Sequence, residues 1–223
     1  MMTSDPSAPV ERSPDLLARA MRSPAAMLVL FVVAGLLVYA PSLHGDLIWD
    51  DGYLVGENPF YKSPIFTLEV FRHWLFFDSF STYYRPVQNI SYMVDYWVWG
   101  GNPFGYHLTN ILVHSLSGLL LFFLLRRLLP ALLGGENRTS SALALLVAGA
   151  WTVHPIHNAG VAYISGRADS LASLFALSAW LLVIRAREAA TASARVLLGA
   201  LSAITMLVAL YANVALKTNL ANC

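Results

Sequence analysis

The sequence predicts an all-α membrane protein with about five transmembrane helices. The chain has 223 residues, of which 57% are hydrophobic and 12% are charged, whereas a soluble domain carries about a quarter charged residues. The hydrophobic residues gather in runs long enough to cross a bilayer. A formal net charge of +1, without blocks rich in Lys or Arg, gives no reason to expect a nucleic-acid partner. Membrane lipids are therefore the first partners to expect.

The amino terminus combines a polar tail with a first span. Residues 1–22 are rich in Pro, Ser and charge, which predicts a disordered tail. The apolar run at about Ala25–Leu43 is longer than the core of a signal peptide and is followed by PSLHGDLIWDD, so we interpret it as a retained transmembrane helix. Four more spans are predicted at about Tyr106–Leu129, Ser141–Val153, Asp169–Ile184 and Val196–Tyr211.

A long first loop, from about residue 44 to 105, separates the first two spans and is crowded with aromatic residues, Pro and charges. Within it, Ser63–Phe76 starts with a Ser-Pro pair and continues with apolar residues at a helical period. Val87–Gly100 has a similar pattern with many Tyr and Trp residues. We expect one or two amphipathic helices lying in the membrane interface.

Basic residues predict the orientation of the chain. With the amino terminus inside, nine basic residues lie on the inner side (Arg12, Arg19, Arg22, Arg126, Arg127, Arg138, Arg185, Arg187 and Arg195) and five on the outer side (Lys62, Arg72, Arg85, Arg167 and Lys217). The positive-inside rule then predicts a cytoplasmic amino terminus and an external first loop.

The second span carries a polar stripe. His107, Asn110, His114 and Gly118 follow one another at offsets of 3, 4 and 4 residues, so they lie on one face of the helix. Ionisable residues in a span usually face the bundle interior or water. We interpret His114, in mid-membrane, as a helix–helix contact and expect His107, near the outer end, to face a cavity.

Two adjacent carboxylates, Asp50 and Asp51, follow the first span in the stretch IWDDGY. Loop carboxylates are most often solvated and Asp-Gly is a common turn sequence, so an ordinary turn is the simpler interpretation. The pair nevertheless follows Trp49 and shares the predicted outer surface with two histidines and two arginines. Carboxylates in a partly dry site raise one another's proton affinity, so either aspartate is a candidate general base.

Four cationic or metal-binding candidates lie on the same predicted surface. Arg85 and Arg167 supply fixed positive charge for an anionic group such as a phosphate, although each alone fits a headgroup-facing arginine equally well. His154 and His157 lie three residues apart in HPIH. A divalent metal held by Asp50, Asp51, His154 and His157 is one interpretation, but the spacing alone favours hydrogen-bonded interface histidines.

The order of these motifs resembles the amino-terminal membrane part of the protein O-mannosyltransferases that carry tetratricopeptide repeats, and of their bacterial relatives, in the GT-C glycosyltransferase superfamily. The resemblance rests on WDDGYLVGENP, YYRPVQNISYMVDYWVWGGNPFGYHLTNILVHSLSGLLLF and AGAWTVHPIHNAGVAYISGRADSLASLFAL. It runs from about Ala25 to Leu210, so residues 23–211 would form a partial GT-C transmembrane domain.

The resemblance implies a multi-pass enzyme of the bacterial inner membrane or the endoplasmic reticulum. It would transfer a hexose, usually mannose, from a polyprenyl or dolichyl phosphate carrier to a Ser or Thr hydroxyl of an acceptor protein on the outer face. Asp50 and Asp51 match the acidic motif, one of them acting as base. Five residues would lie near the lipid phosphate or a metal: Arg85, His107, His154, His157 and Arg167. No cofactor is expected beyond a divalent metal, and the lipid-linked sugar is a substrate.

Two departures qualify the resemblance. Enzymes of this superfamily have more spans and this type ends in helical repeats, and where relatives continue with an acidic KE motif the sequence reads LYANVALKTNLANC. We therefore interpret residues 212–223 as a divergent tail, and the chain as a fragment or the product of a frame shifted near Tyr211, which we would not expect to be active alone. Two alternatives stay open: a non-catalytic membrane scaffold or transporter fragment, and an oligosaccharide polymerase or ligase.

Overall fold

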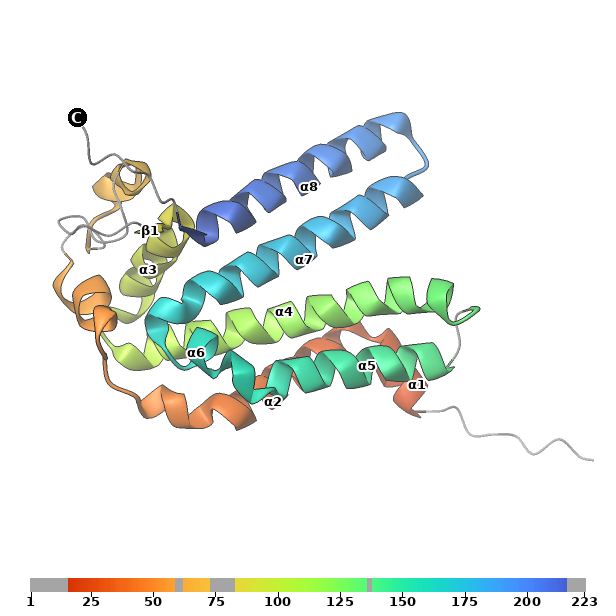
Figure 1. Cartoon of the computed structure of the whole chain (residues 1–223), viewed down its shortest axis with the longest axis horizontal. Helices are drawn as coiled ribbons and strands as arrows, with labels where there is room; N and C mark the ends of the chain where they lie inside the picture. The colour runs from red at the N-terminus through yellow and green to blue at the C-terminus, as the bar shows by residue number, and fades with distance from the viewer. Residues whose placement is uncertain (1–15, 59–61, 73–82, 136–137, 216–223) are drawn as a thin grey trace, which may run out of the picture.

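Long helices run side by side through the molecule and confirm the predicted all-α membrane fold (Figure 1). The computed structural model describes residues 16–58, 62–72, 83–135 and 138–215. In these ranges, four helices are long and apolar enough to cross a membrane. They are α2 (Pro24–Tyr39, continued by the 3-10 turn η1, Ala40–His44), α4 (Pro103–Leu132), α7 (Arg167–Glu188) and α8 (Ala192–Ala212).

A fifth span is bent. Helix α5 (Arg138–Val153) is followed by the 3-10 turn η6 (Pro155–His157) and the short helix α6 (Asn158–Val161), at an angle of 44° to α5. Pro155 lacks a backbone N–H and fixes its own φ, so the helix ends before it. Counted as one span, this pair gives the five spans that the sequence predicts.

Local sequence sets where two of the spans begin. The side chains of Ser23 and Asn102 accept hydrogen bonds from backbone N–H groups of the first turn of α2 and α4, at 3.3 and 3.1 Å. Each is followed by a proline at the first helical position, where the missing N–H costs nothing.

Helix α4 is the centre of the bundle, with α2, α5 and α7 around it (Figure 1). Small residues let the helices approach closely: a Cβ on Gly118 would collide with Oγ1 of Thr152 on α5, and one on Gly35 of α2 would collide with Oγ of Ser115. At the same level, a ring nitrogen of His114 lies 2.9 Å from the carbonyl oxygen of Thr152. The interpretation of His114 as a helix–helix contact is therefore confirmed.

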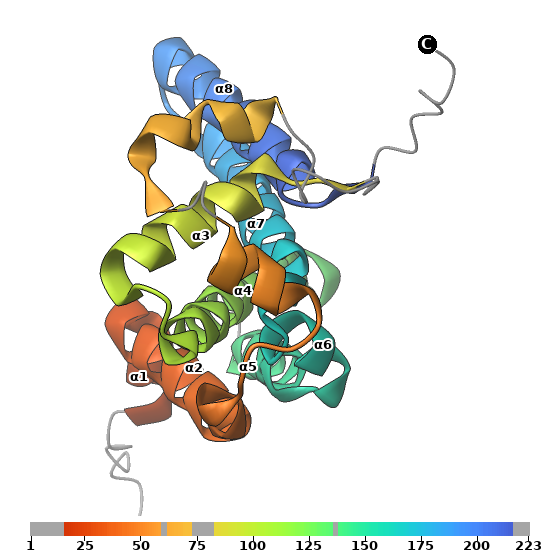
Figure 2. The same cartoon turned by 90° about the vertical axis from the view of Figure 1, so that its left-hand side faces the viewer.

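One end of the bundle is covered by the first loop; we call it the loop end. Figure 2 looks onto it and shows α3 (Pro86–Trp99) lying in front of the helix ends. Around α3 lie the π-helical turn η2 (Gly52–Glu57), the 3-10 turns η4 (Pro64–Thr67), η5 (Glu69–Phe71) and η7 (Ile164–Gly166), and two short paired strands, β1 (Tyr83–Tyr84) and β2 (Val214–Ala215). The opposite end carries α1 (Leu16–Arg22).

Two sequence expectations need correction. The predicted amphipathic helix at residues 63–76 forms two separate 3-10 turns as far as Phe71, and residues 73–76 lie outside the described residues. Ile65 and Leu68 are 78% and 72% exposed, so no packed apolar face stabilises a regular helix there. In the predicted disordered tail, residues 16–22 form α1, because Met21 packs against the start of α2. Residues 1–15 and 216–223, including most of the predicted divergent tail, lie outside the described residues.

Candidate active site

Arg167 is the centre of a buried polar network at the loop end. Its guanidinium has no exposed surface and donates hydrogen bonds to Oδ1 of Asn110 (2.6 Å), Oγ of Ser91 (3.2 Å) and the carbonyl of Tyr106 (3.0 Å). The same group forms an ion pair with Asp95, with Nη2 lying 2.5 Å from Oδ2. These protein groups surround the charge, so the phosphate contact predicted for Arg167 stays a prediction that no described contact supports. We assign to Arg167 the role of holding α3, α4 and α7 together.

The network also fixes the chain between α6 and α7. Asn110 donates from Nδ2 to the carbonyls of Val161 (3.2 Å) and Tyr163 (3.1 Å). Tyr92 donates to the carbonyl of Ile164 (2.9 Å), and Gln88 donates to that of Ser165 (2.7 Å). Side chains from α3 and α4 therefore hold the backbone of residues 161–165, which we call the clamped turn.

Asp51 attaches the first loop to the clamped turn. Its side chain is fully buried, and Oδ1 accepts a hydrogen bond from the backbone N–H of Ser165 at 2.9 Å. Within the described residues, Oδ2 is buried without a hydrogen-bond partner. Burial therefore raises the pKa of Asp51 to about 6, against the lowering effect of backbone N–H groups, and the negative charge of Asp50 adds to the rise.

We expect this raised pKa to make stability depend on pH. Between the ordinary pKa of 3.8 and the folded value of about 6, the folded protein keeps a proton that the unfolded chain has lost. The free energy of unfolding should therefore fall as pH rises through this window and stay level above it. Thermal unfolding of the wild type and of Asp51→Asn in detergent, between about pH 4 and 7, checks this. The asparagine variant should lack this slope, and parallel curves would contradict the raised pKa.

Asp50 differs from Asp51 in its exposure to solvent. It is exposed, and it starts the helical turn that continues into η2. Trp49, just before it, has a positive φ of 49° and is 87% exposed, with its ring edge against Tyr163 of the clamped turn. A left-handed conformation is unfavourable for a bulky residue, and such strain clusters at functional sites. The sharp turn sends Asp50 outward and Asp51 inward.

Arg85 lies at the same end of the bundle and differs from Arg167 in its partners. It precedes α3, and its guanidinium carbon lies 4.6 Å from the centre of the Tyr83 ring. Nε is buried and has no hydrogen-bond partner among the described residues. Of the two arginines predicted to contact a phosphate, Arg85 is thus the one whose guanidinium has a nitrogen without a hydrogen-bond partner among the described residues.

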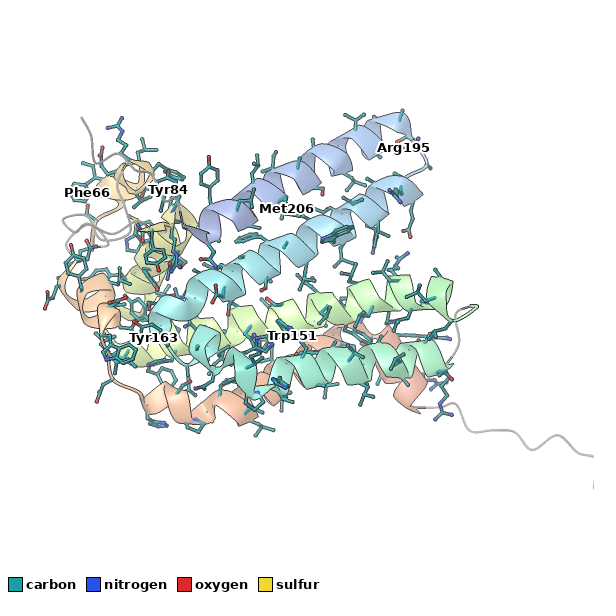
Figure 3. The ribbon with its side chains drawn as sticks, viewed as in Figure 1. Phe66, Tyr84, Trp151, Tyr163, Arg195 and Met206 are labelled. Carbon is teal, nitrogen blue, oxygen red and sulfur yellow. The ribbon has the colours of Figure 1, made fainter. Side chains whose placement is uncertain are left out.

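The two predicted histidines of the HPIH motif belong to a separate cluster. The His157 ring lies tilted against the rings of Trp151 and His114, with ring centres 4.4 and 5.0 Å apart. Figure 3 shows Trp151 beside α4, away from Tyr163 and the clamped turn. A pocket of about 110 Å³ opens here, with Asp169 and Ser170 of α7 on its other side. His154 is exposed, and its Nδ1 accepts a hydrogen bond from the N–H of Ile156.

The candidate metal ligands do not converge. In the part of the chain that the structure describes, no group of three or more His, Cys, Asp or Glu side chains is arranged to hold a metal ion. Asp51 contacts Ser165, whereas His157 contacts α4 and α5. His107, which was expected to face a cavity, is buried at 3% exposure beside Gly45.

The clamped turn depends on a close approach at Gly166. A Cβ added there would collide with the carbonyl oxygen of Ala159 and lie 2.9 Å from Cα of Gly160. We expect Gly166→Ala to lower the unfolding temperature in detergent, because backbone atoms cannot move aside as a side chain can. Gly199→Ala in α8 is the matched control, since its Cβ would meet no atom within 4 Å and alanine favours the helix. Equal unfolding temperatures for the two variants would disprove the requirement for glycine.

Besides Ser91, sequence reasoning missed three residues of the network: Gln88, Tyr92 and Asp95. They lie on the buried face of α3 at offsets of 4 and 3 residues. The sequence interpretation of this helix rested on its aromatic residues. The helical period of Gln88, Tyr92 and Asp95 would have identified them as one face.

Comparison with known proteins places these motifs in a family context. A protein O-mannosyl-transferase of Caenorhabditis elegans is 30% identical over 166 residues, which cover 72% of this chain and 23% of that protein. The protein O-mannosyl-transferases TMTC1 and TMTC2 of Mus musculus are 32% and 34% identical over 77% and 68% of this chain. The chain thus spans only about a fifth of the length of these relatives. No protein-family model matches the chain, and neither does any solved structure.

Proposed function

We propose that this chain, a homologue of the protein O-mannosyl-transferases, forms part of a membrane glycosyltransferase that moves mannose from a polyprenyl or dolichyl phosphate carrier to a Ser or Thr hydroxyl of a protein. The observation that carries the proposal is the exposed Asp50 beside the anchored Asp51, with Arg85 at the same end. The names of the relatives support transfer of mannose to protein. The lipid carrier and the hydroxyl acceptor are the finer part of the proposal.

Each of the three residues Asp50, Arg85 and Asp51 has a separate role in the proposed transfer. Asp50 takes the proton from the acceptor hydroxyl while that oxygen attacks the anomeric carbon of the sugar. The bond between this carbon and the phosphate oxygen breaks, and the carrier phosphate leaves with the electron pair. Arg85 stabilises the charge that develops on the phosphate. Asp51 positions Asp50 by holding the loop on Ser165.

The pocket at His157 is the second part of the proposed site. It lies between α4, α5, α6 and α7, so it is within the membrane-spanning bundle while Asp50 is at its end. The apolar chain of the carrier lies in the membrane, so the carrier approaches this pocket from the membrane side. We propose that His157 contacts the carrier there, while the sugar and phosphate of the carrier lie at Asp50 and Arg85.

The orientation is part of the same proposal. Arg126, Arg127, Arg185 and Arg195 lie at the end of the bundle opposite to Asp50 (Figure 1). By the positive-inside rule this end faces the cytoplasm. The loop end then faces the periplasm or the lumen of the endoplasmic reticulum, where acceptor proteins with unmodified hydroxyls arrive.

The choice of donor tests the proposed function. A full-length transferase that contains this chain is reconstituted in liposomes with a peptide containing Ser and Thr, and is offered labelled mannose either on polyprenyl phosphate or on a nucleotide. Label should enter the peptide from the lipid-linked donor only. Transfer from the nucleotide donor at an equal or higher rate would contradict the proposed carrier.

The alternative of a non-catalytic scaffold has one observation in its favour. Helix packing accounts for the contacts of Asn110, His114 and Arg167. The sequence had suggested Arg167 as a site residue and had placed Asn110 and His114 on the polar stripe of the second span. The scaffold interpretation leaves the outward Asp50 and the donors of Arg85 without a purpose. It predicts no sugar transfer from either donor.

A further inference from the structure

A second pocket lies at the end of the bundle that is opposite to the candidate active site. It has a volume of about 680 Å³ and lies between α4, α7 and the start of α2. Figure 1 shows α4 and α7 diverging toward this end. Its lining residues are Pro24, Phe123, Arg126, Arg127, Leu181 and Arg185.

The three arginines of this pocket differ in how they are held. Arg126 donates from Nη1 to the carbonyl of Met21 at 2.6 Å, which fixes its direction. Arg127 forms an ion pair with Glu188, with Nη1 and Oε1 2.5 Å apart. Arg185 is exposed and has no hydrogen-bond or ion-pair partner among the described residues. Glu188 offsets the charge of Arg127, whereas no described residue offsets the charge of Arg185, so the pocket keeps positive charge.

The positive charge of the pocket and its apolar lining together indicate one class of ligand. Guanidinium groups bind phosphate oxygens through paired hydrogen bonds, and weak hydration suits them to partly buried sites. Phe123, Leu181 and Pro24 give the same pocket apolar walls. The pocket also lies where spanning helices end, which is the level of lipid headgroups. A free phosphate would use the arginines but not the walls, whereas a phospholipid uses both.

We propose that this pocket binds the phosphate headgroup of an anionic membrane phospholipid, with Arg126 and Arg185 as its main ligands and the upper acyl chains against Phe123 and Leu181. Basic pockets between spanning helices recognise anionic headgroups in this manner. The site is separate from the proposed glycosyl transfer and does not depend on it.

Lipid retention by the purified chain tests the proposal. The protein is extracted from vesicles of phosphatidylglycerol and phosphatidylcholine, and the co-purified lipids are counted by native mass spectrometry. Phosphatidylglycerol should be retained over phosphatidylcholine. Arg185→Gln should weaken this retention about fivefold, the size expected for one basic group near an anionic headgroup. Arg126→Gln should do the same.

Arg195→Gln is the matched control. Arg195 lies at the same end, at the tip of the α7–α8 hairpin (Figure 3), and its Nη2 donates to the carbonyl of Ala189. It lines no part of the pocket, so its substitution should leave retention unchanged. Arg185 has no partner to lose in the described structure, so its variant stays interpretable if Arg126→Gln misfolds.

Three results would overturn the proposal. An equal loss in Arg195→Gln would show general attraction between basic residues and anionic lipid. Equal retention of phosphatidylcholine would show an apolar groove without headgroup recognition. Displacement of the lipid by inorganic phosphate alone would show a site for the free anion.

Discussion

Replacing Arg167 by methionine should destabilise the folded chain by about 3–5 kcal/mol, because it leaves a buried carboxylate without its partner. Asp95 is 4% exposed, and burial already raises the pKa of its carboxyl despite the opposing effect of Arg167. The substitution also removes the hydrogen bonds to Asn110, Ser91 and Tyr106. Unfolding in detergent with added denaturant measures the loss.

Two variants show whether the buried charge is the cause. Arg185→Met removes an exposed arginine that has no partner among the described residues, so it should change stability by no more than about 0.5 kcal/mol. Asp95→Leu combined with Arg167→Met should recover part of the loss, because no unpaired charge remains. If Arg167→Met and Arg185→Met had the same small effect, Arg167 could not be the centre of the network.

Replacing Asp50 by asparagine should lower the rate of sugar transfer by about 10²- to 10⁴-fold, the range for loss of a general base. Asparagine keeps the shape of the side chain but cannot accept the proton of the acceptor hydroxyl. The turn before Asp50 and the anchor at Asp51 should survive, so binding of the donor should change little. Rates with a Ser/Thr peptide, at matched protein levels, measure the effect.

Asp51→Asn is the internal comparison for Asp50. Its amide oxygen can still accept the hydrogen bond from Ser165, so the loop should stay attached. We expect at most about a tenfold loss of rate, well below that of Asp50→Asn. The reverse order of effects would identify Asp51, with its raised pKa, as the base.

The spans and their polar face followed from periodicity. Apolar runs of bilayer length predicted α2, α4, α7 and α8, and offsets of 3 and 4 residues placed Asn110 and His114 on the packed face of α4. These predictions succeed because the bilayer requires a long apolar helix and a helix has a fixed repeat.

The parts of the site that failed depend on contacts between distant segments. Nothing near Arg167 in sequence shows that Asp95 and Asn110 surround it, so a headgroup or phosphate contact fitted equally well. Asp50 and Asp51 are adjacent, yet a helical turn starting at Asp50 sends them to opposite environments. The two histidines of HPIH left a metal site open as one interpretation, but the bend after Val153 directs His157 toward Trp151.

The most direct test of the proposed chemistry separates catalysis from donor binding in one protein. Wild-type and Asp50→Asn forms of the full-length transferase that contains this chain are compared in liposomes for retention of a labelled polyprenyl-phosphate mannose and for transfer of its label to a Ser/Thr peptide. We predict equal retention of the donor, with transfer by the variant reduced at least about a hundredfold. Equal transfer by the two proteins would contradict the role of Asp50 as the base.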